Sequence, residues 1–174
     1  WRLAGYVLFD ESDPVFLHEA SLAGTADGGL AIVMRTATYG HKNYDSLPNE
    51  RAYRSVSSDG GRTWSAAKPV PEFHNTGCKA HYLVDSKGRE VYVYSPGPRR
   101  ERKALHYVAR ETGGEWSKPK VFYDGKNHNS YPTLLERPDQ PGEYWCVWDS
   151  SWDYDKKRTT IRFGKFSLAQ NVSS

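Results

Sequence analysis

Charged residues occur where apolar segments of the sequence begin or end, and their types suit the binding of an acidic ligand. Glu19 follows His18 directly before the segment 20–24, and Arg35 follows the five apolar residues 30–34. An ionised side chain at the end of a buried strand is costly unless it is paired, so Arg35 is predicted to bind an anionic group. Glu19 has a simpler alternative, because an exposed Glu at a strand end commonly caps the strand or forms a salt bridge.

Two later segments carry further candidates for such a site, an Arg-rich run and a tyrosine. Residues 99–103 read Arg-Arg-Glu-Arg-Lys before an apolar segment that begins near Leu105, and such a charge run ordinarily forms a solvated loop. Tyr131 stands between Asn129-Ser130 and Pro132, but the chain has 12 Tyr residues, most of which must be packing residues. By residue type alone, neither Arg102 nor Tyr131 is singled out.

Three histidines, His18, His81 and His128, lie near predicted strand starts and could suggest a metal site. The sequence contains no HxH or HxxxH spacing, however, and His is a common partner of sugar hydroxyl groups in a polar cleft. We therefore predict neither a metal nor another cofactor.

The elements that would position these residues are short strands. No window of 11 or more residues shows an apolar stripe with a 3.6-residue period, whereas short segments rich in β-branched and aromatic residues alternate with Gly- and Pro-rich turns. The predicted strands are 3–9, 20–24, 30–36, 52–57, 81–84, 90–94, 105–110, 120–123, 133–135, 144–148 and 160–166. The predicted fold class is all-β.

Composition excludes several classes of protein. The 174 residues carry 24 Lys and Arg against 21 Asp and Glu, and this net charge of +3 without a block of five like charges argues against a nucleic-acid partner. No apolar run approaches the roughly 18 residues of a membrane span. Cys78 and Cys146 form no CxxC pair, so we interpret both as free, half-buried thiols.

A repeat underlies the strand pattern. The octet at 57–64, Ser-Ser-Asp-Gly-Gly-Arg-Thr-Trp, aligns with the octet at 109–116, Ala-Arg-Glu-Thr-Gly-Gly-Glu-Trp, and Ser65 and Ser117 follow them. Units of four strands are typical of propeller blades. The predicted blades are about 19–70, 79–123 and 131–169, with the strand at 2–10 belonging to a preceding or closing blade.

The first octet fits the Asp-box, the S-x-D-x-G-x-T-W hairpin of sialidases and related propellers. An Asp carboxylate and Ser and Thr hydroxyls can hydrogen-bond the backbone of their own turn, so we interpret Asp59 as structural and not catalytic. The order of Glu19, Arg35, the Gly77-Cys78 segment, Arg102 and Tyr131 over residues 18–168 closely resembles the C-terminal half of the exo-sialidase family. The resemblance implies a six-bladed propeller, of which this chain carries about three four-stranded blades.

The resemblance also implies roles for these residues. Tyr131 matches the family's nucleophile and Glu19 the acid that activates it, while Arg35 and Arg102 match two members of its arginine triad, with Arg100 as the alternative to Arg102. Lys79 and His81 replace smaller residues expected after Gly-Cys, and we expect them to contact the substrate. The implied activity is a retaining exo-glycosidase that removes terminal sialic acid.

The family's chemistry gives a reason for each residue type. Sialic acid carries a carboxylate on its anomeric carbon, so a phenol nucleophile avoids the like charge that a carboxylate nucleophile would meet. A phenol titrates near pH 10 and needs a base within hydrogen-bond reach. Guanidinium groups bind a carboxylate in a bidentate manner, which favours Arg over Lys.

The resemblance is incomplete, and two alternatives stay open. The family's first arginine and its Asp acid/base have no counterpart here, so we expect a second chain or a missing segment to complete the propeller. The alternatives are a hydrolase or lyase acting on another acidic glycan, such as a uronic acid, and a non-catalytic glycan-binding propeller. Because glycan-degrading enzymes usually act outside the cytoplasm, we expect a secreted or periplasmic protein.

Overall fold

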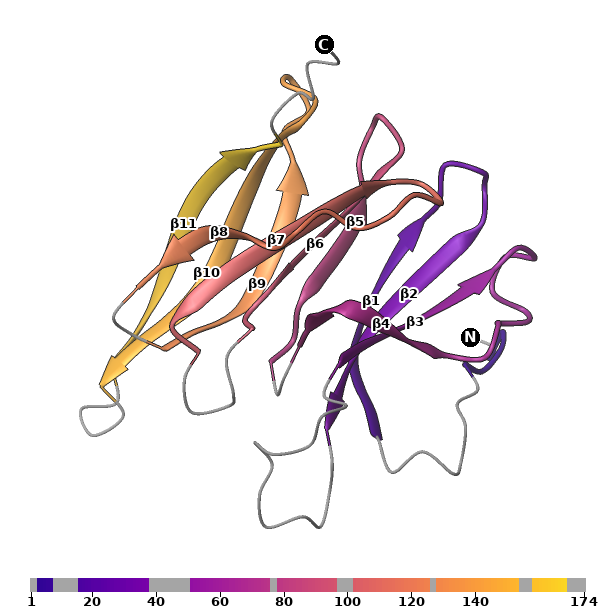
Figure 1. Ribbon diagram of the computed structural model, residues 1–174, viewed down its shortest axis with the longest axis horizontal. Coiled ribbons are helices and arrows are strands. Elements are labelled where there is room, and N and C mark those ends of the chain that lie inside the picture. The colour runs from indigo at the N-terminus through magenta and orange to yellow at the C-terminus, as the bar shows by residue number, and fades with distance from the viewer. Residues whose placement is uncertain are drawn as a thin grey trace.

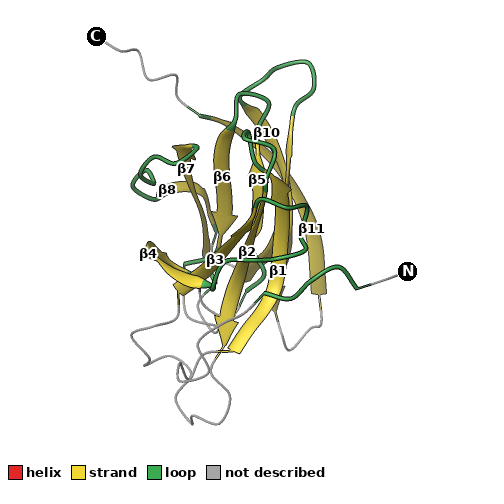
Figure 2. Ribbon diagram, turned by 90° about the vertical axis from the view of Figure 1, so that its right-hand side faces the viewer, coloured by secondary structure: helices red, strands yellow, loops and turns green. Residues whose placement is uncertain are grey.

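The computed structural model describes residues 3–7, 16–37, 51–75, 78–96, 102–125, 128–153 and 158–168. These residues form β-strands and connecting loops without a helix (Figure 2), which confirms the all-β prediction. Within this described part, no helix is present that could cross a membrane.

The strands form three antiparallel sheets, in each of which neighbours along the chain pair with one another. We call the sheets blades 1, 2 and 3. Blade 1 contains β1 (Phe16–Gly24), β2 (Leu30–Ala37), β3 (Arg51–Ser57) and β4 (Lys68–His74). Blade 2 contains β5 (His81–Val84), β6 (Arg89–Tyr94), β7 (Ala104–Glu111) and β8 (Lys120–Asp124). Blade 3 contains β9 (His128–Glu136), β10 (Glu143–Asp153) and β11 (Arg158–Ser167).

The blades stand side by side like the segments of a fan (Figure 1), and the edge strand β5 packs against both β1 and β9. This arrangement is that of a partial propeller, with β1, β5 and β9 as the inner strands.

Three features differ from the sequence prediction. Residues 3–7, predicted as part of a strand, form none. Gly5 lies instead beside the Asp-box turn, where the carbonyl oxygen of Gly61 leaves no room for a Cβ on Gly5. Strand β4 was not predicted, because Pro69 and Pro71 weaken a strand pattern. Blade 3 has three strands within the described residues, and not four.

Aromatic residues fill the spaces between the blades, and β6 shows how. This strand lies inside the middle sheet and is buried on both faces. Its residues Tyr92 and Tyr94 pack in the cluster shared with blade 1, whereas Val91 and Val93 pack in the cluster shared with blade 3. The second cluster includes Tyr144 and Trp148 of β10. Burial on both faces accounts for the continuous apolar and aromatic pattern of β6.

The Asp-box octet folds as its sequence predicts. The Asp59 carboxylate accepts hydrogen bonds from the Thr63 hydroxyl at 2.6 Å, the Thr63 amide at 2.9 and 3.0 Å and the Ser57 hydroxyl at 2.8 Å. These contacts confirm the structural interpretation of Asp59. In both repeats the serine after the octet bonds the backbone in the same way, since Ser65 Oγ accepts from the Val56 amide and Ser117 Oγ from the Ala109 amide, each at 3.1 Å.

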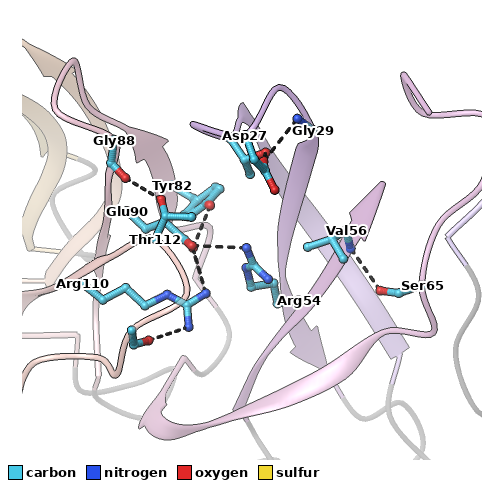
Figure 3. Close-up of polar contacts among 12 residues, drawn as sticks. Asp27, Gly29, Arg54, Val56, Ser65, Tyr82, Gly88, Glu90, Arg110 and Thr112 are labelled. Carbon is cyan, nitrogen blue, oxygen red and sulfur yellow. Dashed lines mark hydrogen bonds and ion pairs between the residues drawn. The ribbon is translucent and has the colours of Figure 1, made fainter. Parts of the chain in front are cut away.

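A buried carboxylate joins blades 1 and 2. Glu90 of β6 is fully buried and accepts hydrogen bonds from Arg110 at 3.0 Å, Arg54 of blade 1 at 3.3 Å and the Tyr82 hydroxyl at 2.9 Å (Figure 3). Burying this charge is tolerable because two guanidinium groups compensate it. The ion pair with Arg54 fixes one blade against the next.

Candidate functional site

The predicted site residues lie at one end of the sheets. Glu19 is near the start of β1 and Arg35 near the end of the antiparallel β2. Lys79 and His81 stand at the start of β5, Arg102 lies two residues before β7, and Tyr131 is near the start of β9. Strands β1 and β9 run in the same direction (Figure 1). The Asp-box follows the end of β3, so it lies at the opposite end of its blade.

Glu19 lies at a break in the pairing of β1 with β2. The register shifts between His18 and Ala20, and Glu19 has a φ of 24°. Its carboxylate forms an ion pair and hydrogen bond with the guanidinium of Arg35, and both side chains are partly buried. The structure thus partners the predicted acid with a predicted substrate-binding arginine. Within the described residues, no hydrogen bond joins Glu19 to the Tyr131 hydroxyl.

Tyr131 lies at a similar break in β9. The pairing with β10 shifts between Val147 and Asp149, and Tyr131 has a φ of 54°. The residue is 41% exposed, and the guanidinium carbon of Arg102 lies 6.0 Å from the centroid of its ring. The Tyr131 phenol is therefore open to solvent beside a cation.

Glu19 and Tyr131 are the only non-glycine residues with positive φ among the described residues. A bulky side chain in this region costs of the order of 1–3 kcal/mol and persists only where the surrounding structure holds it. β-Bulges redirect side chains at functional sites. The two strained positions in the described chain thus coincide with the two residues predicted as catalytic.

Arg102 is almost fully buried, with 7% of its surface exposed. Its Nη1 lies 3.3 Å from Nε2 of His128, and burial together with the Arg102 charge lowers the pKa of His128. Asn129 supports the same segment, because its side-chain amide donates to the Lys103 carbonyl at 2.6 Å and its oxygen accepts from the Trp148 indole at 3.0 Å. The alternative residue, Arg100, lies outside the described residues.

Cys78 lies among the predicted residues. Its thiol is fully buried and accepts a hydrogen bond from the Tyr131 amide at 3.2 Å. Burial raises the pKa of this thiol, and the charges of Arg102, Glu19 and Arg35 act on it to a smaller extent. Cys78 thus contacts the backbone of Tyr131 and lies within electrostatic reach of the other three residues. Both cysteines are free and buried.

Sequence reasoning missed three members of this site. It treated Cys78 as a packing thiol, although Cys78 directly precedes Lys79. It assigned neither His128 nor Asn129 to the site, although both stand shortly before Tyr131. Lys79 and His81 make no side-chain hydrogen bond to other described residues; burial, and then the Lys79 charge, lowers the pKa of His81. No group of three or more His, Cys, Asp or Glu side chains in the described segments could hold a metal ion.

Comparison with known proteins places this geometry in context. The family model described as BNR repeat-like domain matches residues 17–144. No curated protein sequence matches the chain significantly.

Several solved structures share the fold. The intramolecular trans-sialidase from Ruminococcus gnavus, solved with oseltamivir carboxylate, is 20% identical, with a TM-score of 0.64 and coverage of 86% of this chain and 32% of that one. The NanB sialidase from Streptococcus pneumoniae is 14% identical, with a TM-score of 0.66 and coverage of 86% and 23%. An α-L-arabinanase from Penicillium chrysogenum is 14% identical, with a TM-score of 0.61 and coverage of 87% and 46%.

The chain thus spans between 23% and 46% of the length of these three proteins. At such identities the similarity establishes the fold and not the reaction. What the chain shares with the three proteins is the β-propeller fold.

Proposed function

Because the chain belongs to the family of BNR repeat-like domains, we propose that it carries part of the active site of a sialidase-type exo-glycosidase. The substrate is a glycan ending in sialic acid, which is hydrolysed with retention of configuration, and Tyr131 is the nucleophile. The observation that carries this proposal is the positive φ of Glu19 and Tyr131, which marks the two predicted catalytic residues as strained positions.

Two arginines favour an acidic sugar over a neutral one. Arg35 pairs with Glu19 and Arg102 lies beside the Tyr131 ring, and each can bind a substrate carboxylate through a planar guanidinium. A neutral arabinan, the kind of polymer named for the Penicillium structure, has no carboxylate to pair with them. The arginines thus support a sialoside, and a uronic acid is the second candidate.

The ion pair between Glu19 and Arg35 suggests how substrate binding activates the nucleophile. A substrate carboxylate that binds Arg35 competes with Glu19 for the guanidinium. The released Glu19 carboxylate then accepts the Tyr131 phenol proton as the phenol oxygen attacks the anomeric carbon. The bond to the aglycone oxygen breaks as that oxygen takes up a proton from an acid. Water later attacks the same carbon and gives a proton to the conjugate base of that acid. The tyrosyl–sugar bond breaks at the same time, and Glu19 returns its proton to the phenol oxygen.

The acid and a third arginine are to come from further blades, in a second chain or in another segment of the protein. Blade 3 supports this part of the proposal, because its face away from blade 2 exposes Leu135, Val147, Ile161 and Phe163. An apolar sheet face of this kind suits cover by another blade. Secretion or a periplasmic location would bring such an enzyme to its glycans.

The test is hydrolysis of a fluorogenic sialoside by the full-length protein and by Tyr131→Phe. We expect kcat to fall by at least about 10³-fold when the nucleophilic oxygen is removed. Tyr123→Phe, which removes a phenol oxygen from blade 2, is the matched control and retains activity. Wild-type turnover by Tyr131→Phe would refute the mechanism. Preference for a glucuronide would move the substrate to the second candidate, and absence of turnover on sialosides, glucuronides and arabinan would favour a binding module.

A further inference from the structure

A hydrogen bond between two blades reaches the backbone of the proposed nucleophile. The Tyr131 amide in β9 of blade 3 donates to Sγ of Cys78 at 3.2 Å, and Cys78 lies three residues before β5 of blade 2. The Cys78 thiol itself donates to the Lys79 carbonyl at 3.3 Å. The Cys78 sulfur thus donates a hydrogen bond within its own loop and accepts one from the Tyr131 amide of blade 3.

The position of this contact matters because Tyr131 is strained. Its φ of 54° lies in the left-handed region, where a tyrosine costs free energy that surrounding contacts must offset. The pairing of β9 with β10 shifts register at this point, so regular strand pairing does not determine the Tyr131 backbone. The buried Cys78 sulfur therefore constrains the Tyr131 backbone at a point where strand pairing constrains it less.

The surroundings of Cys78 argue against a reactive thiol. Its surface is fully buried, and burial raises its pKa, so the sulfur stays protonated near neutral pH. A neutral thiol can donate through its S–H and accept through its lone pairs at the same time, which is the pattern seen here.

We propose that Cys78 is a positioning residue that holds the Tyr131 backbone in its left-handed conformation and so directs the phenol toward the guanidinium of Arg102. The catalytic part of this inference rests on the proposed function, whereas the structural part does not. Displacing a reacting group by about 1 Å can reduce a rate about 10²-fold, so a small change in the Tyr131 backbone has a large consequence.

Cys146 provides a matched control. It is also free and fully buried, and it interacts with the backbone of Thr133, two residues beyond Tyr131 on the same strand. At that point β9 and β10 are in regular register, with Thr133 paired with Val147. Cys146→Ala therefore removes a similar thiol from blade 3, the sheet that contains Tyr131, without touching the strained position.

The experiment compares Cys78→Ala, Cys78→Ser and Cys146→Ala in the full-length protein. The first readout is hydrogen exchange of the Tyr131 amide by NMR, and the second is kcat and KM on a fluorogenic sialoside. For Cys78→Ala we expect exchange about tenfold faster or more and kcat about 10- to 100-fold lower, with little change in KM. Cys78→Ser, which keeps an acceptor, restores most of both, and Cys146→Ala leaves both near wild type.

The inference is overturned if Cys78→Ala leaves the exchange of the Tyr131 amide unchanged, or if Cys146→Ala accelerates it equally. If Cys78→Ala does not fold, Cys78→Ser decides: its Tyr131 amide must be more protected than in Cys78→Val, which fills the site without an acceptor. The exchange readout needs no turnover. Faster exchange in a protein that hydrolyses no sialoside would therefore refute the proposed function and leave the positioning role standing.

Discussion

Glu19 and Arg35 form an ion pair across the first two strands of blade 1, at the break in pairing that gives Glu19 its positive φ. The pair couples a proposed proton acceptor to a proposed carboxylate-binding group. We therefore expect substitution of Glu19 to lower mainly kcat and substitution of Arg35 to raise mainly KM.

Glu19→Gln keeps the size of the side chain and removes its charge and basicity. We expect kcat on a sialoside to fall about 10²- to 10⁴-fold, the usual contribution of a positioned proton acceptor, with a smaller effect on KM. Glu143→Gln is the control, because Glu143 also pairs with an arginine, Arg137 at 2.9 Å, but lies at the end of blade 3 away from Tyr131. Equal losses in the two variants would remove Glu19 from the mechanism.

Arg35→Lys and Arg102→Lys keep the positive charge but lose the planar fork of donors. We expect KM for a sialoside to rise at least about tenfold in each, because one ammonium cannot bind a carboxylate in a bidentate manner. Steady-state kinetics measure this, with Arg137→Lys as the variant that should behave as wild type. An unchanged KM in both substitutions would show that neither arginine binds the substrate carboxylate.

Glu90→Gln tests the buried charge between blades 1 and 2. Its removal leaves the guanidinium groups of Arg54 and Arg110 without their compensating carboxylate. Breaking one side of a buried ion pair destabilises a protein by about 3–5 kcal/mol, and urea unfolding would show a loss of this size. Glu111→Gln, at an exposed position of blade 2, should stay within about 0.5 kcal/mol of wild type. A Glu90 variant as stable as this control would contradict the compensation argument.

Asp59 makes the Asp-box sensitive to acid. Hydrogen bonds from the Thr63 hydroxyl, the Thr63 amide and the Ser57 hydroxyl hold the pKa of its carboxyl well below the ordinary value of 3.8. A depressed folded-state pKa contributes stability above the unfolded-state pKa, and this contribution is lost as pH falls below that value. Asp59→Asn should therefore lower Tm at pH 7, and its difference from wild type should shrink below about pH 4.

Thermal melts between pH 7 and pH 2 measure this difference. Glu111→Gln changes the aligned position of the second octet and serves as the control for the loss of a charge. A gap between wild type and Asp59→Asn that stays constant over the whole range would show that the carboxylate does not contribute through its ionisation.

Much of the fold could be predicted from the sequence, because it rests on local signals. The octet at 57–64 fixes a turn through its own hydrogen bonds, and its counterpart at 109–116 exposes the repeat. Strand β4 was not predicted, because a segment with two prolines has the sequence pattern of a loop. Residues 3–7 were wrongly predicted as a strand for the opposite reason. Their apolar pattern suits a strand, but the segment packs against a turn and joins no sheet.

The residue types of the candidate site can be seen in the sequence, whereas its geometry cannot. The types and order of Glu19, Arg35, Arg102 and Tyr131 are visible in the chain. The left-handed backbone of Tyr131 is not, because a tyrosine disfavours it and only tertiary contacts impose it. The partnership of Cys78 with Tyr131 spans 53 positions and two blades, so no local pattern could indicate it.

The two prolines of β4 also affect how the protein behaves in concentrated solution. Strand β4 is the outer edge of blade 1, and residues 69 and 71 have no N–H to donate to an incoming chain. An edge with fewer backbone donors is a poor template for the edge-to-edge growth that leads to fibrils. The feature that hid this strand from sequence prediction thus protects the blade against aggregation.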